Sequence, residues 1–183
     1  MNRNQLTLLN TLGLLCMTDI LLIGFILQFV LNELPCPQCL LQRVGFVMVA
    51  FGFMLNVVYG PQSRHYGIVL IGTLYGIATS LRQVSLHVNQ STPCYSSPIF
   101  GMHYYTWALV LFAATIFFVA VILMLTNKAE SNESYNMTNF GRLVCVLAIV
   151  VVTLDVIATF VECGPYRCPD NPVSYWLFNQ GTG

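Results

Sequence analysis

Hydrophobic residues occur along this chain in long runs, and polar residues are mostly confined to short links between them. Five runs reach the roughly 20 residues that a helix needs to cross the hydrocarbon core of a bilayer. They cover residues 12–31, 40–59, 66–88, 104–125 and 143–161. The links at 60–65, 89–103 and 127–142 are too short for a separate soluble domain. The pattern therefore predicts an all-α membrane protein.

The five runs fall into two expected parts. Residues 1–126 are predicted to form a four-helix transmembrane bundle, and residues 127–183 to add a cytoplasmic link, an additional fifth transmembrane helix and an outer tail. Three glycines in the third run, Gly67, Gly72 and Gly76, have the small-residue spacing that lets helices approach closely. A cleaved signal peptide is not expected, because the first run is too long and lacks a small-residue cleavage site.

Composition agrees with this assignment and excludes other classes of protein. Hydrophobic residues make up 56 % of the chain and charged residues 8 %, whereas soluble proteins carry about 25 % charged residues. The formal net charge is zero, so the basic footprint of a nucleic-acid-binding protein is absent. A chain this apolar is not disordered. The surface is expected to face membrane lipid.

The cationic residues suggest an orientation. A cytoplasmic N-terminus gives four cations inside and three outside, which is a small positive-inside excess. The inner ones would be Arg3, Arg64, Lys128 and Arg142, and the outer ones Arg43, Arg82 and Arg167. The same orientation gathers five of the seven cysteines at the outer face, namely Cys36, Cys39, Cys94, Cys163 and Cys168. We therefore expect a cytoplasmic N-terminus and an outer C-terminus.

Two cysteines and two aspartates lie within the apolar runs themselves. Cys16 and Cys145 are expected to be buried and to behave as small hydrophobic side chains. Asp19 and Asp155 are carboxyl groups at membrane depth, where ionisable residues are functional candidates by default. We favour structural roles for both, with hydroxyl or amide neighbours as partners in the bundle interior.

The strongest chemical signal is the Cys36-Pro37-Gln38-Cys39 turn that precedes the second run. Two cysteines at a helix start have the geometry of a reactive dithiol, because the positive end of the helix stabilises a thiolate. Arg43 follows Cys39 by one turn on the same face. On spacing alone, a static disulfide or half of a zinc site remain alternatives, although zinc would be unusual in loops this short.

The residues from Cys36 to Arg43 resemble the signature of the disulfide bond formation protein B family. Two further stretches support this resemblance, namely residues 81–86 in the third run and residues 100–107 at the start of the fourth. The resemblance covers roughly residues 12–125. It implies a four-helix transmembrane core in the bacterial inner membrane and an enzyme that generates disulfides.

The resemblance also implies partners and residue roles. Family members accept electrons from a periplasmic thioredoxin-like disulfide oxidase and pass them to the membrane quinone pool, as ubiquinone or menaquinone. Cys36 and Cys39 would be the pair next to the quinone, with Cys39 as the expected partner of the ring. Arg43 would help to bind the quinone, and His87 would assist protons or a quinone carbonyl. No metal is implied.

The chain departs from the family pattern in its second cysteine pair. Family members carry two cysteines in the second outer loop, but here that loop holds only Cys94, and the outer tail holds Cys163 and Cys168. Either the two tail cysteines form a local disulfide that shuttles electrons, or Cys94 pairs with one of them. We slightly favour Cys94 as a participant. A tail disulfide that is only a staple is a third alternative.

Two other functions remain open at the level of sequence. One is a quinone-linked thiol oxidase similar to vitamin K epoxide reductase, although in that family the reactive pair lies late in the bundle. The other is a non-catalytic membrane scaffold whose disulfides are static. We favour the thiol–disulfide oxidoreductase, with Cys36, Cys39, Cys94, Cys163 and Cys168 as catalytic candidates.

Overall fold

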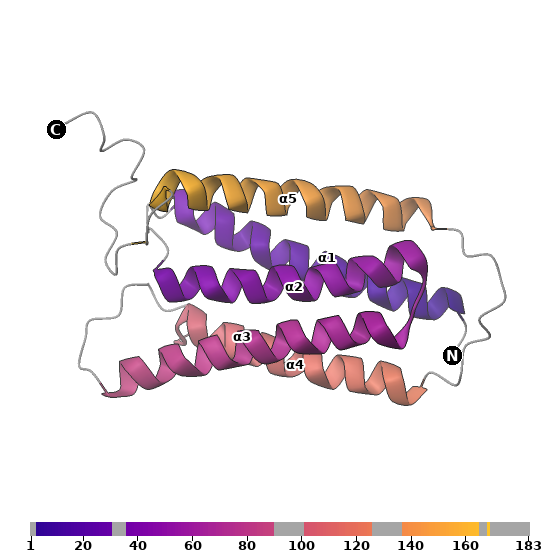
Figure 1. The fold of residues 1–183 in the computed structure, drawn as a ribbon, viewed down its shortest axis with the longest axis horizontal. Coiled ribbons are helices and arrows are strands. Elements are labelled where there is room, and N and C mark those ends of the chain that lie inside the picture. Colours follow the sequence, from indigo (N-terminus) through magenta and orange to yellow (C-terminus); the bar gives the residue numbers. More distant parts are fainter. Residues whose placement is uncertain (1–2, 31–35, 90–100, 126–136, 165–167, 169–183) are drawn as a thin grey trace.

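The computed structural model describes residues 3–30, 36–89, 101–125, 137–164 and 168, and within these ranges the chain forms five α-helices (Figure 1). They are α1 (Arg3–Val30), α2 (Pro37–Tyr59), α3 (Ser63–Asn89), α4 (Tyr104–Leu125) and α5 (Asn139–Cys163). Each is long and apolar enough to cross a membrane. The predicted all-α membrane fold, four helices plus a fifth, is confirmed.

The helices extend beyond the apolar runs that predicted them. Helix α1 begins at Arg3 and α5 at Asn139, several residues before the corresponding runs. A helix can continue past the hydrocarbon core because its backbone hydrogen bonds are satisfied internally. At α5 the boundary is set by Thr138, whose hydroxyl oxygen accepts the Gly141 N–H at 3.1 Å.

Successive helices run in opposite directions, so α1, α3 and α5 finish at the end where α2 and α4 begin (Figure 1). We call this the cysteine end, because Cys36, Cys39 and Cys163 lie there. Helix α2 packs against α3 and α1, α4 packs against α3, and α5 packs against α1 and to a lesser extent α2. The fifth helix is therefore added at the α1/α2 flank, away from α4.

The core is packed closely around the α2–α3–α4 contact. The rings of Phe46 and Phe112 stack with centroids 4.2 Å apart. A side chain at Gly76 would collide with the ring of Phe112, and a Cβ at Gly72 would lie 2.8 Å from that of Met48. The expected role in close helix approach is therefore confirmed for Gly72 and Gly76. It is wrong for Gly67, because, apart from its neighbours along the helix, no residue that the structure describes lies within 4 Å of the position its Cβ would take.

A buried polar cluster ties three helices together near the end opposite the cysteines. The amide of Asn10 on α1 donates to the hydroxyl oxygen of Tyr66 at 2.7 Å. The amide of Asn56 on α2 donates to Asn10 Oδ1 at 2.9 Å, and Asn56 Oδ1 lies 3.0 Å from Nδ1 of His65 on α3. Interhelical hydrogen bonds of this kind stabilise bundles in lipid, so the cluster fixes the register of α1, α2 and α3.

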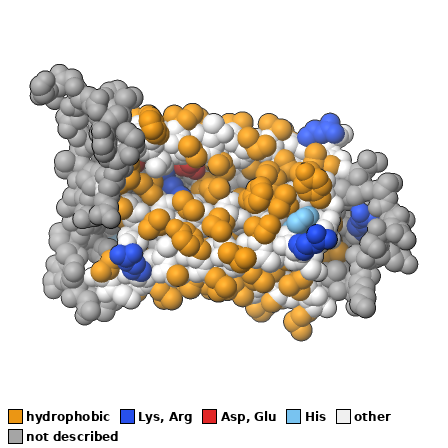
Figure 2. Space-filling model, in the orientation of Figure 1, with side chains coloured by type: hydrophobic (Ala, Val, Ile, Leu, Met, Phe, Trp, Pro, Cys, Tyr) orange, Lys and Arg blue, Asp and Glu red, His pale blue; other side chains and the backbone are white. Residues whose placement is uncertain are grey.

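The flank of the bundle is apolar. Hydrophobic side chains are spread along the whole middle of the face shown in Figure 2, and Lys and Arg side chains lie mostly towards the ends. Large residues such as Phe117 and Met124 are 73 % and 83 % exposed. Contiguous apolar surface on this scale marks a membrane-facing protein, which agrees with the five candidate spans.

Two expectations about residues inside the runs are wrong. Cys16 and Asp19 are exposed on α1, rather than buried or paired in the interior. Helix α1 packs through a different face, which carries Leu14, Met17 and Leu21, and the 3.6-residue period turns Cys16 and Asp19 outward. Cys145 is buried as expected.

Candidate active site

The paired cysteines occupy the first turn of α2. Cys36 is the N-cap residue, and its sulfur accepts the backbone N–H of Cys39 at 3.2 Å. Pro37 follows at the first helical position, where its missing N–H costs nothing and its fixed φ suits the helix. The sequence placed Cys39 at the helix start. In the structure Cys36 caps the helix, so its sulfur also meets the free N–H groups there.

Two glutamines hold the dithiol. Cys36 and Cys39 carry free, partly exposed thiols. The side-chain amide of Gln83 on α3 donates to Cys36 Sγ at 3.5 Å and lies 3.8 Å from Cys39 Sγ. Gln42 donates to Gln83 Oε1 at 2.9 Å, and this contact directs the NH₂ group of Gln83 towards the sulfurs. Hydrogen bonds to a thiolate favour the charged form.

The two thiols are not equivalent. The side-chain hydrogen bond with the Cys39 sulfur, followed by burial, raises the pKa of the Cys36 thiol well above its ordinary value, although the backbone N–H groups of Cys39 and Gln38 oppose this shift. In the reduced pair Cys36 is therefore the sulfur that keeps its proton. A nucleophilic thiolate in this pair belongs on Cys39.

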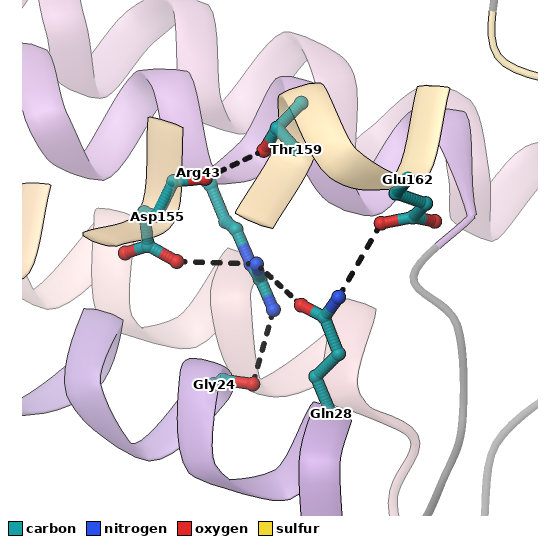
Figure 3. Close-up of polar contacts among 6 residues, drawn as sticks. All are labelled: Gly24, Gln28, Arg43, Asp155, Thr159 and Glu162. Carbon is teal, nitrogen blue, oxygen red and sulfur yellow. Dashed lines mark hydrogen bonds and ion pairs between the residues drawn. The ribbon is translucent and has the colours of Figure 1, made fainter. Parts of the chain in front are cut away.

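One turn further along α2, the guanidinium of Arg43 forms a buried cluster with α1 and α5 (Figure 3). Its Nη1 donates to Gln28 Oε1 at 3.0 Å and to Asp155 Oδ1 at 3.2 Å, and its Nη2 donates to the Gly24 carbonyl oxygen at 3.0 Å. The side chains of Arg43 and Asp155 are only 16 % and 7 % exposed. A guanidinium at this depth needs such partners, because desolvating an unpaired charge is costly.

A second carboxyl group of α5 reaches the same cluster. Glu162 Oε2 accepts the side-chain amide N–H of Gln28 at 3.4 Å, and Glu162 is 2 % exposed (Figure 3). Gln28 thus bridges Arg43 and Glu162, with its side-chain oxygen towards Arg43 and its side-chain nitrogen towards Glu162. We call the four side chains Gln28, Arg43, Asp155 and Glu162 the Arg43 cluster.

The end of α5 carries a disulfide. Gly164 caps the helix with φ of 62° and donates its N–H to the Phe160 carbonyl oxygen at 2.8 Å. This positive φ favours glycine, and it turns the chain out of the helix immediately after Cys163. Cys163 is bonded to Cys168. This is the bond expected both for the shuttle disulfide and for the staple, and Cys94 lies outside the described residues.

The structure brings some of the predicted site residues together, and others lie outside the residues that it describes. Cys36, Cys39 and Arg43 come together at the start of α2, and the Cys163–Cys168 disulfide lies at the same end of the bundle. Cys94 lies outside the described residues, as does the side chain of His87, whose backbone belongs to α3. Within the described ranges, no three His, Cys, Asp or Glu side chains gather to hold a metal ion.

Sequence reasoning missed several members of the site. It gave no role to Gln28, Gln83 or Glu162, and it expected Asp155 to pair with a hydroxyl or amide neighbour. That expectation is wrong, because Asp155 pairs with the guanidinium of Arg43. One signal was present: Asp155 and Glu162 are seven residues apart, which places them on the same face of a helix.

Comparisons with known proteins bear on the same residues. The family model described as disulfide bond formation protein DsbB matches residues 5–98. That range contains α1, α2 and α3, with both cysteines of the dithiol, Arg43 and Gln83. No solved structure matches the chain.

Several curated relatives named disulfide bond formation protein B are similar to the chain. The protein of Chromohalobacter salexigens is 30 % identical over 49 % of this chain and 54 % of its own length. That of Chromobacterium violaceum is 36 % identical over 43 % and 49 %, respectively. That of Burkholderia thailandensis is 30 % identical over 64 % and 88 %. The chain thus spans about half the length of most of these relatives.

The cluster predicts a strong energetic coupling between α2 and α5. Arg43→Met leaves Asp155 buried without its cation, and Asp155→Leu leaves the guanidinium without its anion. We expect each to lower the free energy of unfolding in detergent by about 3–5 kcal/mol. The double variant should lose less stability than the two single variants lose together, by about 0.5–3 kcal/mol. The exposed Arg82→Met is the matched control, and strict additivity of the two cluster variants would contradict the pairing.

Proposed function

This chain belongs to the disulfide bond formation protein B family, and from that premise we propose that it is a membrane thiol–disulfide oxidoreductase coupled to a quinone. The observation that carries the proposal is the free dithiol at the start of α2, in which Cys36 caps the helix N-terminus and Gln83 donates to its sulfur. Such a pair can attack a disulfide as a thiolate and can itself close to a disulfide.

The donor set around the dithiol fits a quinone. Quinone oxygens accept hydrogen bonds, and three of the five N–H groups of Arg43 are used by Gln28, Asp155 and Gly24. Within the described part of the chain, the other two have no acceptor and would be available to polarise a bound carbonyl group. Gly24 presents no side chain beside them, and even a Cβ there would stay 3.7 Å from the guanidinium. When bound, a quinone supplies the acceptor for two electrons and two protons.

The chain's own residues then have distinct tasks. Cys39 is the nucleophilic sulfur and Cys36 is the sulfur that holds a proton until the disulfide closes. Gln83 donates to whichever sulfur carries charge. Arg43 holds a positive charge beside the reacting groups, and Asp155 and Gln28 fix its direction. The partly exposed position of the cysteines leaves them accessible to a second disulfide.

The Cys163–Cys168 disulfide is the proposed first acceptor of electrons, with Cys94 as a further participant. A thiolate of the incoming dithiol attacks one sulfur of this disulfide, forms a mixed disulfide and releases the other sulfur as a thiol. The second thiol of the incoming protein then resolves the mixed disulfide. The same exchange, repeated by the reduced tail pair on a Cys36–Cys39 disulfide, moves two electrons towards Arg43.

The proposed electron donor is a periplasmic thioredoxin-like disulfide oxidase, and the proposed acceptor is ubiquinone or menaquinone of the bacterial inner membrane. The cysteine end would then face the periplasm, with the N-terminus in the cytoplasm and the C-terminus outside. The arginines support this orientation, because Arg3, Arg64 and Arg142 lie near the opposite end and Arg82 towards the cysteine end.

The dithiol itself is tested by replacing one sulfur. We expect Cys39→Ser to abolish quinone reduction by a reduced thioredoxin-like protein in membranes, because no disulfide can close without that sulfur. Cys16→Ser, on the exposed face of α1, is the matched control and should keep normal turnover. Turnover in Cys39→Ser equal to that of the control would rule out the proposed reaction.

The tail disulfide is tested by removing it as a unit. If it accepts electrons first, Cys163→Ser/Cys168→Ser should lose turnover with the protein donor but keep turnover with a small dithiol such as dithiothreitol, which can reach Cys36 and Cys39 directly. If the disulfide is only a staple, the variant should retain most of its turnover with either donor. The ratio of the two rates therefore separates a relay from a staple.

A further inference from the structure

Glu162 is a buried carboxyl group whose hydrogen bonding is incomplete. It lies in the last turn of α5, one residue before the disulfide-bonded Cys163, and it is 2 % exposed. Oε2 has a single long contact, 3.4 Å from Gln28, and Oε1 has no partner within the part of the chain that the structure describes. An incompletely bonded acid in a membrane bundle is costly and calls for a function.

The Arg43 cluster is electrically neutral only if one of its two carboxyl groups is protonated. The cluster contains one cation, Arg43, and two carboxyl groups, those of Asp155 and Glu162 (Figure 3). Asp155 makes the direct ion pair at 3.2 Å. If Glu162 were also ionised, a net negative charge would be buried at membrane depth, which is unfavourable. A neutral cluster therefore carries one exchangeable proton, and the less firmly bonded carboxyl group is that of Glu162.

The same carboxyl group is linked to the helix that carries the dithiol. Gln28 joins Glu162 to Arg43, and Arg43 follows Cys39 by one turn of α2. Among the described residues, the ionisable groups that act on Glu162 are Arg43 and Cys39 from α2 and Asp155 from its own helix, while α1 contributes the neutral amide of Gln28. Glu162 is therefore the carboxyl group that Gln28 connects to the arginine beside the dithiol.

We propose that Glu162 is the proton carrier of the Cys36–Cys39 pair, a role that rests on the proposed quinone-linked oxidation. Closing the pair breaks two S–H bonds, forms one S–S bond and releases two electrons and two protons. A bound quinone would take up the two electrons and two protons. Glu162 would give its proton towards the quinone and regain one from the Cys39 thiol, which thereby becomes the nucleophilic thiolate. The proton of Cys36 would leave to water at the membrane surface, and that water would supply the second proton, so the count balances.

The other members of the cluster are positioning residues for this transfer. Gln28 holds Glu162 through its amide nitrogen while its oxygen is held by Arg43. Asp155 remains the ionised partner of Arg43, and this keeps the guanidinium from pairing with Glu162 instead. A carboxyl group that neither ion-pairs nor fully hydrogen-bonds is free to change its protonation state.

The experiment uses the full chain in lipid nanodiscs and compares Glu162→Gln and Glu162→Asp with a matched control, Asp19→Asn. Asp19 is also an acid within a span, but it is exposed on α1 and lies outside the cluster. The first readout is the infrared difference spectrum between oxidised and dithiothreitol-reduced protein without quinone. The second is single-turnover reduction of a short-chain ubiquinone analogue. Thiol counting verifies that Cys163–Cys168 still forms.

We expect a protonated-carboxyl band that changes on reduction in the wild type and in Asp19→Asn but is missing from Glu162→Gln. Single-turnover quinone reduction should fall about 100-fold in Glu162→Gln, as for loss of a general acid, and recover partly in Glu162→Asp. The same carboxyl band in Glu162→Gln, or turnover within twofold of wild type, would overturn the proposal. A wild type that shows the band but reduces no quinone would instead refute the quinone coupling.

Discussion

The ion pair between Arg43 and Asp155 is the interaction on which the arrangement at the cysteine end depends. A guanidinium inside a bilayer needs an anion and hydrogen-bond acceptors, since water is not there to solvate it. Helix α5 supplies the anion, and α1 supplies the Gln28 and Gly24 oxygens. Three helices are thereby held around one side chain of α2, one turn from the dithiol.

This constraint makes the fifth helix part of the site. The region that matches the family model ends at residue 98 and contributes Cys36, Cys39, Arg43 and Gln83. Helix α5 lies beyond that region, and it contributes the counter-ion of Arg43, a second carboxyl group and one half of a disulfide. The positive charge beside the dithiol is therefore set by residues from both parts of the chain. Loss of α5 would leave Arg43 without its ionic partner.

Much of the fold was predictable because lipid imposes simple rules. The lengths of the apolar runs gave five helices, since the hydrocarbon core fixes how many residues a span needs. The dithiol was predictable from local spacing, and Arg43 from its distance of four residues along a helix. Burial was less predictable: Cys16 and Asp19 occupy an apolar run whose every face looks alike in sequence, and only packing determines which face turns outward.

The partners of Arg43 could not be predicted, because they come from helices that are far apart in sequence. Gln28 and Asp155 are 15 and 112 positions away from it, respectively. The pairing depends on α5 lying against α1 and α2, which no local pattern specifies. The seven-residue spacing of Asp155 and Glu162 indicated a shared face but not what that face would contact. Likewise, cysteine spacing left the wiring of Cys163 open until the turn at Gly164 was known.

The most direct test of this account is a distance measurement between the two charged groups in a bilayer. Solid-state NMR on the full chain, with ¹⁵N in the arginine guanidinium groups and ¹³C in the aspartate carboxyl groups, reports their dipolar coupling. We predict the strong coupling of a direct contact, with the 3.2 Å separation of Arg43 Nη1 and Asp155 Oδ1, and its loss in Asp155→Asn. A wild-type spectrum with no more coupling than that variant would contradict the ion pair and the placement of α5.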